Sequence, residues 1–164
     1  MGKGGQIGGG ILLFVVGSII LTVILNPELL VAPPSDLRQI ELETFNRINQ
    51  ERSDRGLPVL ANDTNLCLVA REWSESMLSE DKLGHGNFDA RMKTIGYMNK
   101  YECGEVIAMC SGHRTGIPDI FVKGWLSSTG HREIMLTPKH GKMGVGVARD
   151  GDTYYATVDF IFYD

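Results

Sequence analysis

Residues 144–162 have the sequence GVGVARDGDTYYATVDFIF, and this stretch decides the fold. The dipeptide Asp150-Gly151 at its centre is a strong signal for the tight turn of a β-hairpin. After the turn, every second residue is apolar on one face of the expected strand: Ala156, Val158, Phe160 and Phe162. The stretch therefore predicts two antiparallel strands, one face of which packs on a core.

Helical spacing dominates the residues before this hairpin. Apolar residues three or four positions apart predict two helices. Their stripes are Leu37, Ile40, Thr44 and Ile48 in the first, and Leu66, Ala70, Trp73 and Met77 in the second. Residues 90–95 are also expected to be helical, as are residues 119–136, with an end or bend at Gly130. Residues 101–109 are expected to form a strand broken by Gly104. Helices followed by strands, with one helix between them, predict an α+β fold in which helices cover an antiparallel sheet.

Length and charge limit the possible functions. The chain has 164 residues, which suggests one folded domain. Its net charge is −4, and residues 27–164 carry 15 basic and 20 acidic side chains. Because binding to nucleic acid needs a concentrated basic surface, an acidic domain of this kind argues against a nucleic-acid partner.

The N-terminal segment predicts a membrane anchor. The run from Ile7 to Leu25 has no charged residue, and as a helix it would span roughly 28 Å, close to the thickness of a bilayer core. Lys3 precedes the run and acidic residues follow it, which places the N-terminus in the cytoplasm. We therefore expect a cytoplasmic tip (residues 1–6), a single transmembrane helix (7–25), a linker (26–36) and an extracytoplasmic domain (37–164).

A cleaved signal peptide is the alternative for this segment. Leu30-Val31-Ala32 is a weak cleavage site followed by Pro33, and the apolar run is longer than the core of a usual signal peptide. An anchor at the cell membrane is thus the favoured interpretation. If the segment is removed, the domain is secreted.

Three cysteines, Cys67, Cys103 and Cys110, allow at most one intrachain disulfide. Cys103 and Cys110 lie on either side of Glu105 and are the better candidates for a bridge. Cys67 falls in an apolar helical stripe, where a buried free thiol is common. The sequence contains no CxxC pair, which argues against a zinc site made of thiolates.

Two histidines and one carboxylate are the candidate functional residues. His85 lies between two glycines, His131 follows Gly130, and Glu105 follows Gly104. Glycines beside these side chains favour an approachable site, so we expect the three residues to meet in one polar cleft. The other two histidines, His113 and His140, are expected to be exposed, and Trp73 and Trp125 to anchor the core.

Together, six short patterns in this order resemble the CAP superfamily, which comprises cysteine-rich secretory proteins, antigen 5 and pathogenesis-related proteins. The patterns are Ile48-Asn49-x-x-Arg52-x-x-x-Gly56-Leu57-x-x-Leu60, Leu66-x-x-x-Ala70-x-x-Trp73 with His85, Gly104-Glu105-Val106-Ile107, Trp125-x-x-Ser128-x-x-His131-Arg132, Met143-Gly144-Val145-Gly146, and Tyr154-Tyr155 to Phe160. The resemblance covers residues 37–162, essentially the whole expected domain, in the compact prokaryotic form of the family.

This resemblance implies a three-layer α-β-α sandwich with a cleft that holds two histidines and, in many members, two glutamates. The matching positions are His85, Glu105 and His131, while Ser128 stands where the second glutamate would be. Val106 replaces the asparagine that is more usual after the first glutamate. Members of the family bind divalent metals, sterols or other lipids, and protease activity has been proposed for a few.

Two chemical interpretations of the cleft remain open. His85 and His131 suit a divalent metal, with zinc as the first choice, and Glu105 either as a further ligand or as an acceptor that orients one ring. Such a site would be weak and would lose its metal near pH ~6.5, where imidazole protonates. Alternatively, the three residues form a hydrogen-bonded network that stabilises the fold without metal.

The favoured function is a membrane-anchored binding module whose cleft takes a small-molecule, lipid or peptide ligand. The alternative is a metal-dependent hydrolase of envelope peptides or lipids, with Glu105 as its general base and best candidate for a catalytic residue. A serine triad of Ser127 or Ser128 with His131 and Glu105 is disfavoured, because the sequence has no G-x-S-x-G nucleophile elbow.

Overall fold

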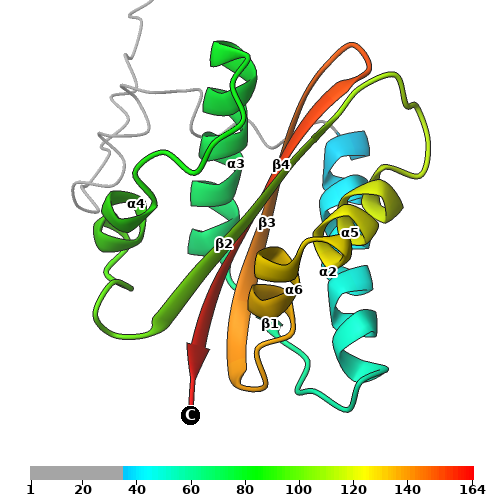
Figure 1. Cartoon of the computed structure of the whole chain (residues 1–164). Coiled ribbons are helices and arrows are strands. Elements are labelled where there is room, and N and C mark those ends of the chain that lie inside the picture. The colour runs from blue at the N-terminus through cyan, green and yellow to red at the C-terminus, as the bar shows by residue number, and fades with distance from the viewer. Residues whose placement is uncertain (1–34) are drawn as a thin grey trace, which may run out of the picture. The chain divides into compact units, whose positions relative to one another are not determined.

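A four-stranded sheet lies between two layers of helices in the computed structural model, which describes residues 35–164 (Figure 1). The strands are β1 (Ala61–Asn62), β2 (Glu102–Cys110), β3 (His140–Asp150) and β4 (Thr153–Tyr163), in the spatial order β1-β3-β4-β2. The helices are α2 (Ser35–Ser53), α3 (Thr64–Glu80), α4 (Phe88–Thr94), α5 (Ile117–Ser127) and α6 (Thr129–Met135). The predicted α+β fold is confirmed, with α3 and α4 on one face of the sheet and α2, α5 and α6 on the other.

The transmembrane helix expected at residues 7–25 lies outside the described residues. Between residues 35 and 164, no helix has the length and apolar character that crossing a bilayer requires. Helix α2 begins at Ser35, inside the segment expected as a linker.

The hairpin at the C-terminus forms as predicted and supplies the centre of the sheet. Val145 of β3 lies opposite Val158 of β4, and Gly151 adopts a positive φ of 58° in the turn. Strand β2 pairs with the other side of β4, also antiparallel. The two residues of β1 pair with β3 in parallel, so the sheet is antiparallel except for this short strand.

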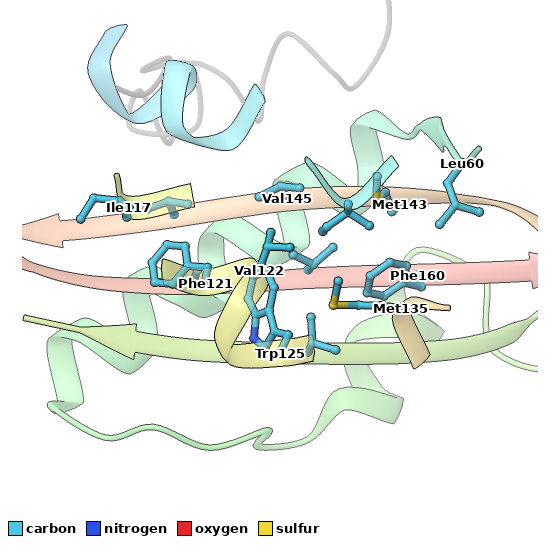
Figure 2. Packing of buried hydrophobic residues seen from close by; sticks show 14 of the residues in the cluster. Leu60, Ile117, Phe121, Val122, Trp125, Met135, Met143, Val145 and Phe160 are labelled. Atoms are coloured by element: carbon cyan, nitrogen blue, oxygen red, sulfur yellow. The ribbon is translucent and has the colours of Figure 1, made fainter. Parts of the chain in front are cut away.

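The main core lies on the face of the sheet that α2, α5 and α6 cover (Figure 2). The alternate residues of β4 predicted to face a core are all buried there: Ala156, Val158, Phe160 and Phe162. Phe121 and Trp125 of α5 stack with ring centroids 5.7 Å apart, and the Trp125 indole N–H donates to the Ile107 carbonyl at 2.8 Å. Trp125 is thus the core anchor that the sequence predicts.

Two glycines of β3 allow α3 to lie close against the other face. A Cβ atom at Gly144 would be 2.2 Å from the backbone nitrogen of Cys67, and one at Gly146 would be 2.1 Å from that of Arg71. Because α3 and α4 cover this face, the β4 residues Tyr155, Thr157, Asp159 and Ile161 are buried as well. Among them is Asp159, a carboxylic acid with no exposed surface.

The expected disulfide between Cys103 and Cys110 is wrong. All three cysteines are free. Cys103 and Cys110 lie at opposite ends of the single strand β2, and seven residues of extended chain span about 23 Å. A disulfide requires Cα atoms no more than about 7 Å apart.

The helix predicted over residues 119–136 is two helices. Ser128 has extended backbone angles (φ −93°, ψ 124°) and separates α5 from α6. This break turns α6 toward β2. The strand expected at residues 101–109 is β2, which continues through Gly104 without interruption.

Candidate functional site

His85 and His131 come from opposite helical layers and meet beside β2, the edge strand of the sheet. His85 lies in the loop between α3 and α4, and His131 lies in α6. Their ring centroids are 6.4 Å apart with an angle of 55° between the ring planes. The sheet edge makes this possible, because side chains from both faces can approach one another around the last strand.

Glu105 lies beneath the histidine pair and has both carboxylate oxygens engaged. Its side chain is only 2% exposed. One oxygen accepts a hydrogen bond from Nδ1 of His85 at 2.7 Å, and the other pairs with the Arg91 guanidinium. The predicted convergence of His85, Glu105 and His131 is therefore what the fold produces.

Arg91 of α4 is a site residue that the sequence did not identify. Besides its bond to Glu105, it donates to the backbone carbonyl of His85 at 3.0 Å. Its guanidinium also lies 4.1 Å from the centre of the Trp73 ring, within the range of a cation–π contact. No local pattern marks Arg91, because its role depends on the buried carboxylate of Glu105 on another element, which requires a cation nearby.

The loop that carries His85 is shaped around Trp73, which was expected as a core anchor but is only partly buried and packs against a small core cluster that includes Met77 and Tyr155. The indole N–H of Trp73 donates to the Gly84 carbonyl at 3.0 Å. Gly86 has a positive φ of 53°, and a Cβ atom there would be 2.2 Å from the Trp73 ring. Only glycine fits this position, so Gly86 has a structural role beside His85.

A third glycine brings α6 to the strand. A Cβ atom at Gly104 would be 2.8 Å from a methyl group of Ile134, which lies one turn along α6 from His131. The Gly104-Glu105 pair therefore combines two functions: the glycine admits the helix that carries His131, and the glutamate holds His85.

Ser128 lies at the junction of α5 and α6, partly buried, and its side chain caps neither helix. Within residues 35–164 it forms no side-chain hydrogen bond to His85, Glu105 or His131. The Ser127 hydroxyl donates to the Lys123 carbonyl at 2.7 Å and leaves His131 without a serine partner in the described residues. The structure thus gives no support to a serine triad.

The hydrogen bond to Glu105 fixes which ring nitrogen of His85 faces outward. A carboxylate bonded to Arg91 can only accept, so Nδ1 of His85 carries the proton and Nε2 presents its lone pair. The His85 side chain is 52% exposed, so this lone pair is accessible. Burial, followed by repulsion from the His85 ring when that ring is protonated, lowers the pKa of His131 below 6.5 and favours its neutral form.

The donor set fits an open metal site of two imidazole nitrogens. A carboxylate that orients a histidine from behind is a common second partner of metal-binding histidines. The Glu105 side chain is almost fully buried and each of its oxygens bonds to a protein donor, so Glu105 fits an orienting role better than that of a further ligand. Across residues 35–164, no group of three or more His, Cys, Asp or Glu side chains is arranged to hold a metal ion.

The remaining histidines are outside the site. His113 and His140 are exposed, as predicted.

Comparison with known proteins identifies the family of the chain. A family model described as "CAP: Cysteine-rich secretory protein family" matches residues 45–163. The uncharacterized protein YkwD of Bacillus subtilis (strain 168) is 33% identical over 127 residues, which cover 74% of this chain and 47% of that protein. The chain therefore spans about half the length of this curated relative.

Solved structures share the fold. An outer surface protein of Borrelia burgdorferi superposes with a TM-score of 0.64 at 18% identity, covering 77% of this chain and 94% of that one. An extracellular protein with an SCP domain from Bacillus anthracis str. Ames gives a TM-score of 0.57 at 29% identity, covering 81% of this chain and 45% of that one. The family match over residues 45–163, together with the YkwD relative, shows that this chain belongs to the CAP (cysteine-rich secretory protein) family.

Proposed function

We propose that this CAP domain is an extracytoplasmic binding module whose ligand is held by His85 and His131 at the edge of β2. The observation that carries the proposal is the engagement of both Glu105 oxygens, by Arg91 and by His85. This arrangement presents the outer nitrogen of His85 and holds the ring in one orientation. A preorganised pair of donors on rigid elements is what a binding site needs.

The same observation argues against Glu105 as a general base. A general base must lie within hydrogen-bond reach of the proton that it removes. Glu105 is buried, and each of its oxygens already bonds to a protein donor, so a bound molecule would have to displace these partners to reach it. Glu105 therefore fits the role of an orienting group better than that of a catalytic one.

A divalent cation such as zinc is compatible with this site. His85 and His131 would hold it, and Glu105 would orient His85 from behind. With only two protein nitrogens, the ion would keep open positions for oxygen atoms of a second ligand, such as a small molecule, a lipid headgroup or a peptide. The cation would supply charge attraction for that ligand.

Isothermal titration of the full-length chain, purified in detergent, with zinc tests the site directly. We expect binding by the wild type, its loss in His85→Ala, and no change in His113→Ala, because His113 is exposed and lies outside the site. Glu105→Gln should weaken binding by about 10–100-fold, since it removes the group that orients His85. Equal heats from the wild type and His85→Ala would contradict the metal site.

A turnover assay separates the binding module from a hydrolase. Envelope peptides and lipids would be incubated with wild-type protein and with folded Glu105→Gln. We expect no turnover by either protein. Substrate cleavage by the wild type that Glu105→Gln abolishes would overturn the binding proposal in favour of a hydrolase.

We also propose that residues 7–25 hold the domain at the outer side of the cell membrane. The support is the uncharged run with Lys3 before it and acidic residues after it. Cell fractionation with protease treatment of intact spheroplasts tests this: the domain should sediment with membranes and be digested from outside. Recovery of a shortened chain in the medium would instead indicate cleavage of the segment.

A further inference from the structure

Asp159 is a buried acid that the proposed binding function does not use. It lies on β4 directly opposite Glu105 of β2, and paired residues of neighbouring strands point to the same face. Asp159 has no exposed surface, and the whole Glu105 residue, backbone included, is 4% exposed. Two carboxyl groups thus lie side by side in the interior, under the loop that carries His85.

The charges around this pair do not balance if both acids are ionised. Arg91 from α4 is the cation beside them, and its contacts go to Glu105 and the His85 carbonyl. Within residues 35–164, no hydrogen-bond donor reaches either oxygen of Asp159, and Nε of Arg91 has no acceptor. Asp159 is therefore not the ion-pair partner of Arg91.

The other groups that face Asp159 supply no compensating charge. On β2 these are Glu105 and the thiol of Cys103. Strand β3 places Gly144 opposite it, and the part of α3 that packs here is apolar, with Leu66 and Val69. His85 lies beyond Glu105 and donates to that carboxylate.

We propose that Asp159 is a neutral carboxylic acid at pH 7 and donates its proton in a hydrogen bond to Glu105. The buried pair then carries one negative charge, which matches the one positive charge of Arg91. If both carboxyl groups were ionised, each could only accept, and no hydrogen bond could form between them. Burial, followed by the negative charge of Glu105, raises the pKa of Asp159 well above its ordinary value, in agreement with this assignment.

This assignment makes Asp159 a positioning residue for the site. Its O–H donates to Glu105, Glu105 accepts from His85, and the outer nitrogen of His85 faces solvent. The chain of hydrogen bonds would hold whether or not a metal binds, so its test is independent of the proposed function.

The pH dependence of stability distinguishes the neutral acid from a merely structural carboxylate. An acid whose pKa is raised in the folded state favours folding below its unfolded value of about 3.9, and this contribution is lost as the pH rises toward the folded pKa. Asp159→Asn keeps a donor of the same shape but cannot ionise when the chain unfolds. We therefore expect Asp159→Asn to be more stable than the wild type at pH 7 and equally stable near pH 3.5.

Urea unfolding of the full-length protein, followed by tryptophan fluorescence, measures this difference, because both tryptophans lie in the domain. Between about pH 4 and 7, the ratio of the two unfolding constants should grow by about tenfold per pH unit. Asp152→Asn, at an exposed position, is the matched control and should show no such growth. A constant difference between Asp159→Asn and the wild type at all pH values would overturn the proposal.

The protonation of Asp159 can also be measured directly in the wild type, which needs no variant that folds. In the wild type, the carbon-13 chemical shift of the Asp159 carboxyl group should be that of an acid at pH 7, while that of Asp152 is that of a carboxylate. A carboxylate shift for Asp159 at pH 7 would also overturn the proposal.

Discussion

Arg91 contacts three parts of the site at once: the Glu105 carboxylate, the His85 carbonyl and the Trp73 ring. The Glu105 side chain is almost fully buried, so its charge depends on this guanidinium. A buried charge that loses its partner is costly, whereas an exposed ion pair contributes little. The stability of the site therefore depends on one residue of a seven-residue helix.

Arg91→Met keeps the length of the side chain and removes its charge. We expect a loss of about 3 kcal/mol in the free energy of unfolding at pH 7, because Glu105 is left buried without a cation. Arg114→Met, at an exposed position, should change stability by less than about 0.5 kcal/mol. Urea denaturation of the three proteins measures both effects, and equal losses in the two variants would show that Arg91 does not compensate Glu105.

His131 makes the domain sensitive to acid. Burial lowers its pKa below 6.5, so the folded state favours the neutral ring. For a base of this kind, stability is fully present above the unfolded pKa of about 6.5 and is lost as the pH falls through the folded pKa. Between pH 7.5 and 5, the wild type should therefore lose more stability than His131→Asn, in which the group cannot protonate. The control His113→Asn should follow the wild type, and a steeper loss in His131→Asn would contradict the sign of the shift.

The residues of the site could be predicted from the sequence only where their neighbours were unusual. His85, Glu105 and His131 stand beside glycines, and the structure gives those at 86 and 104 a packing role. Arg91 and Asp159 have no such local signal. Their importance comes from burial and from a partner on another element, and neither can be deduced from the residues next to them in the chain.

At the scale of elements, α6 depends on a close approach to β2 that Gly104 permits. Ile134 of α6 occupies the space where a Cβ atom at this position would lie. The sequence predicted an end or bend of the 119–136 helix at Gly130, whereas the break lies two residues earlier, at the extended backbone of Ser128. The disulfide prediction was wrong although a strand was predicted over residues 101–109. An extended chain between Cys103 and Cys110 holds the two thiols too far apart to bond. By contrast, the hairpin was predictable because Asp-Gly between two alternating apolar segments is a strong signal for a tight turn.

Gly104→Ala should displace α6 and with it His131. We expect a loss of about 1–3 kcal/mol in the free energy of unfolding, typical of overpacking, together with weaker zinc binding in calorimetry. Gly130→Ala is the matched control, because a Cβ atom at Gly130 meets nothing within 4 Å. The double variant Gly104→Ala/Ile134→Ala should recover part of the loss, since it removes the methyl group in conflict. No recovery in that double variant would mean that the strain lies elsewhere.

At the scale of the whole molecule, two buried polar side chains of α2 connect this helix to distant parts of the chain. Arg52 of α2 has no exposed surface and donates to three carbonyls, of Pro58, Met135 and Lys139, so it joins α2 to the end of α6. Glu41 of α2 accepts from the Arg71 side chain of α3 and from the backbone N–H of Val147 at 3.1 Å. The resemblance identified Arg52 as part of a pattern, but two of its three partners are 83 and 87 residues away along the chain.

Strand β1 pairs with β3 only at Lys142 and Met143, so the rest of this edge of β3 has no neighbouring strand. Glu41 accepts the hydrogen bond of the Val147 N–H on that edge. Glu41→Ala would leave the N–H of Val147 without an acceptor and the Arg71 guanidinium without its partner, so we expect a loss of about 2–3 kcal/mol in the free energy of unfolding. A double-mutant cycle with Arg71→Met separates the two terms. If the ion pair dominates, the double variant should be little worse than Glu41→Ala alone, with a coupling of about 1 kcal/mol or more. If Glu41 acts mainly through Val147, the two losses should add, and the edge of the sheet rather than the connection between helices is then the reason for a carboxylate at this position.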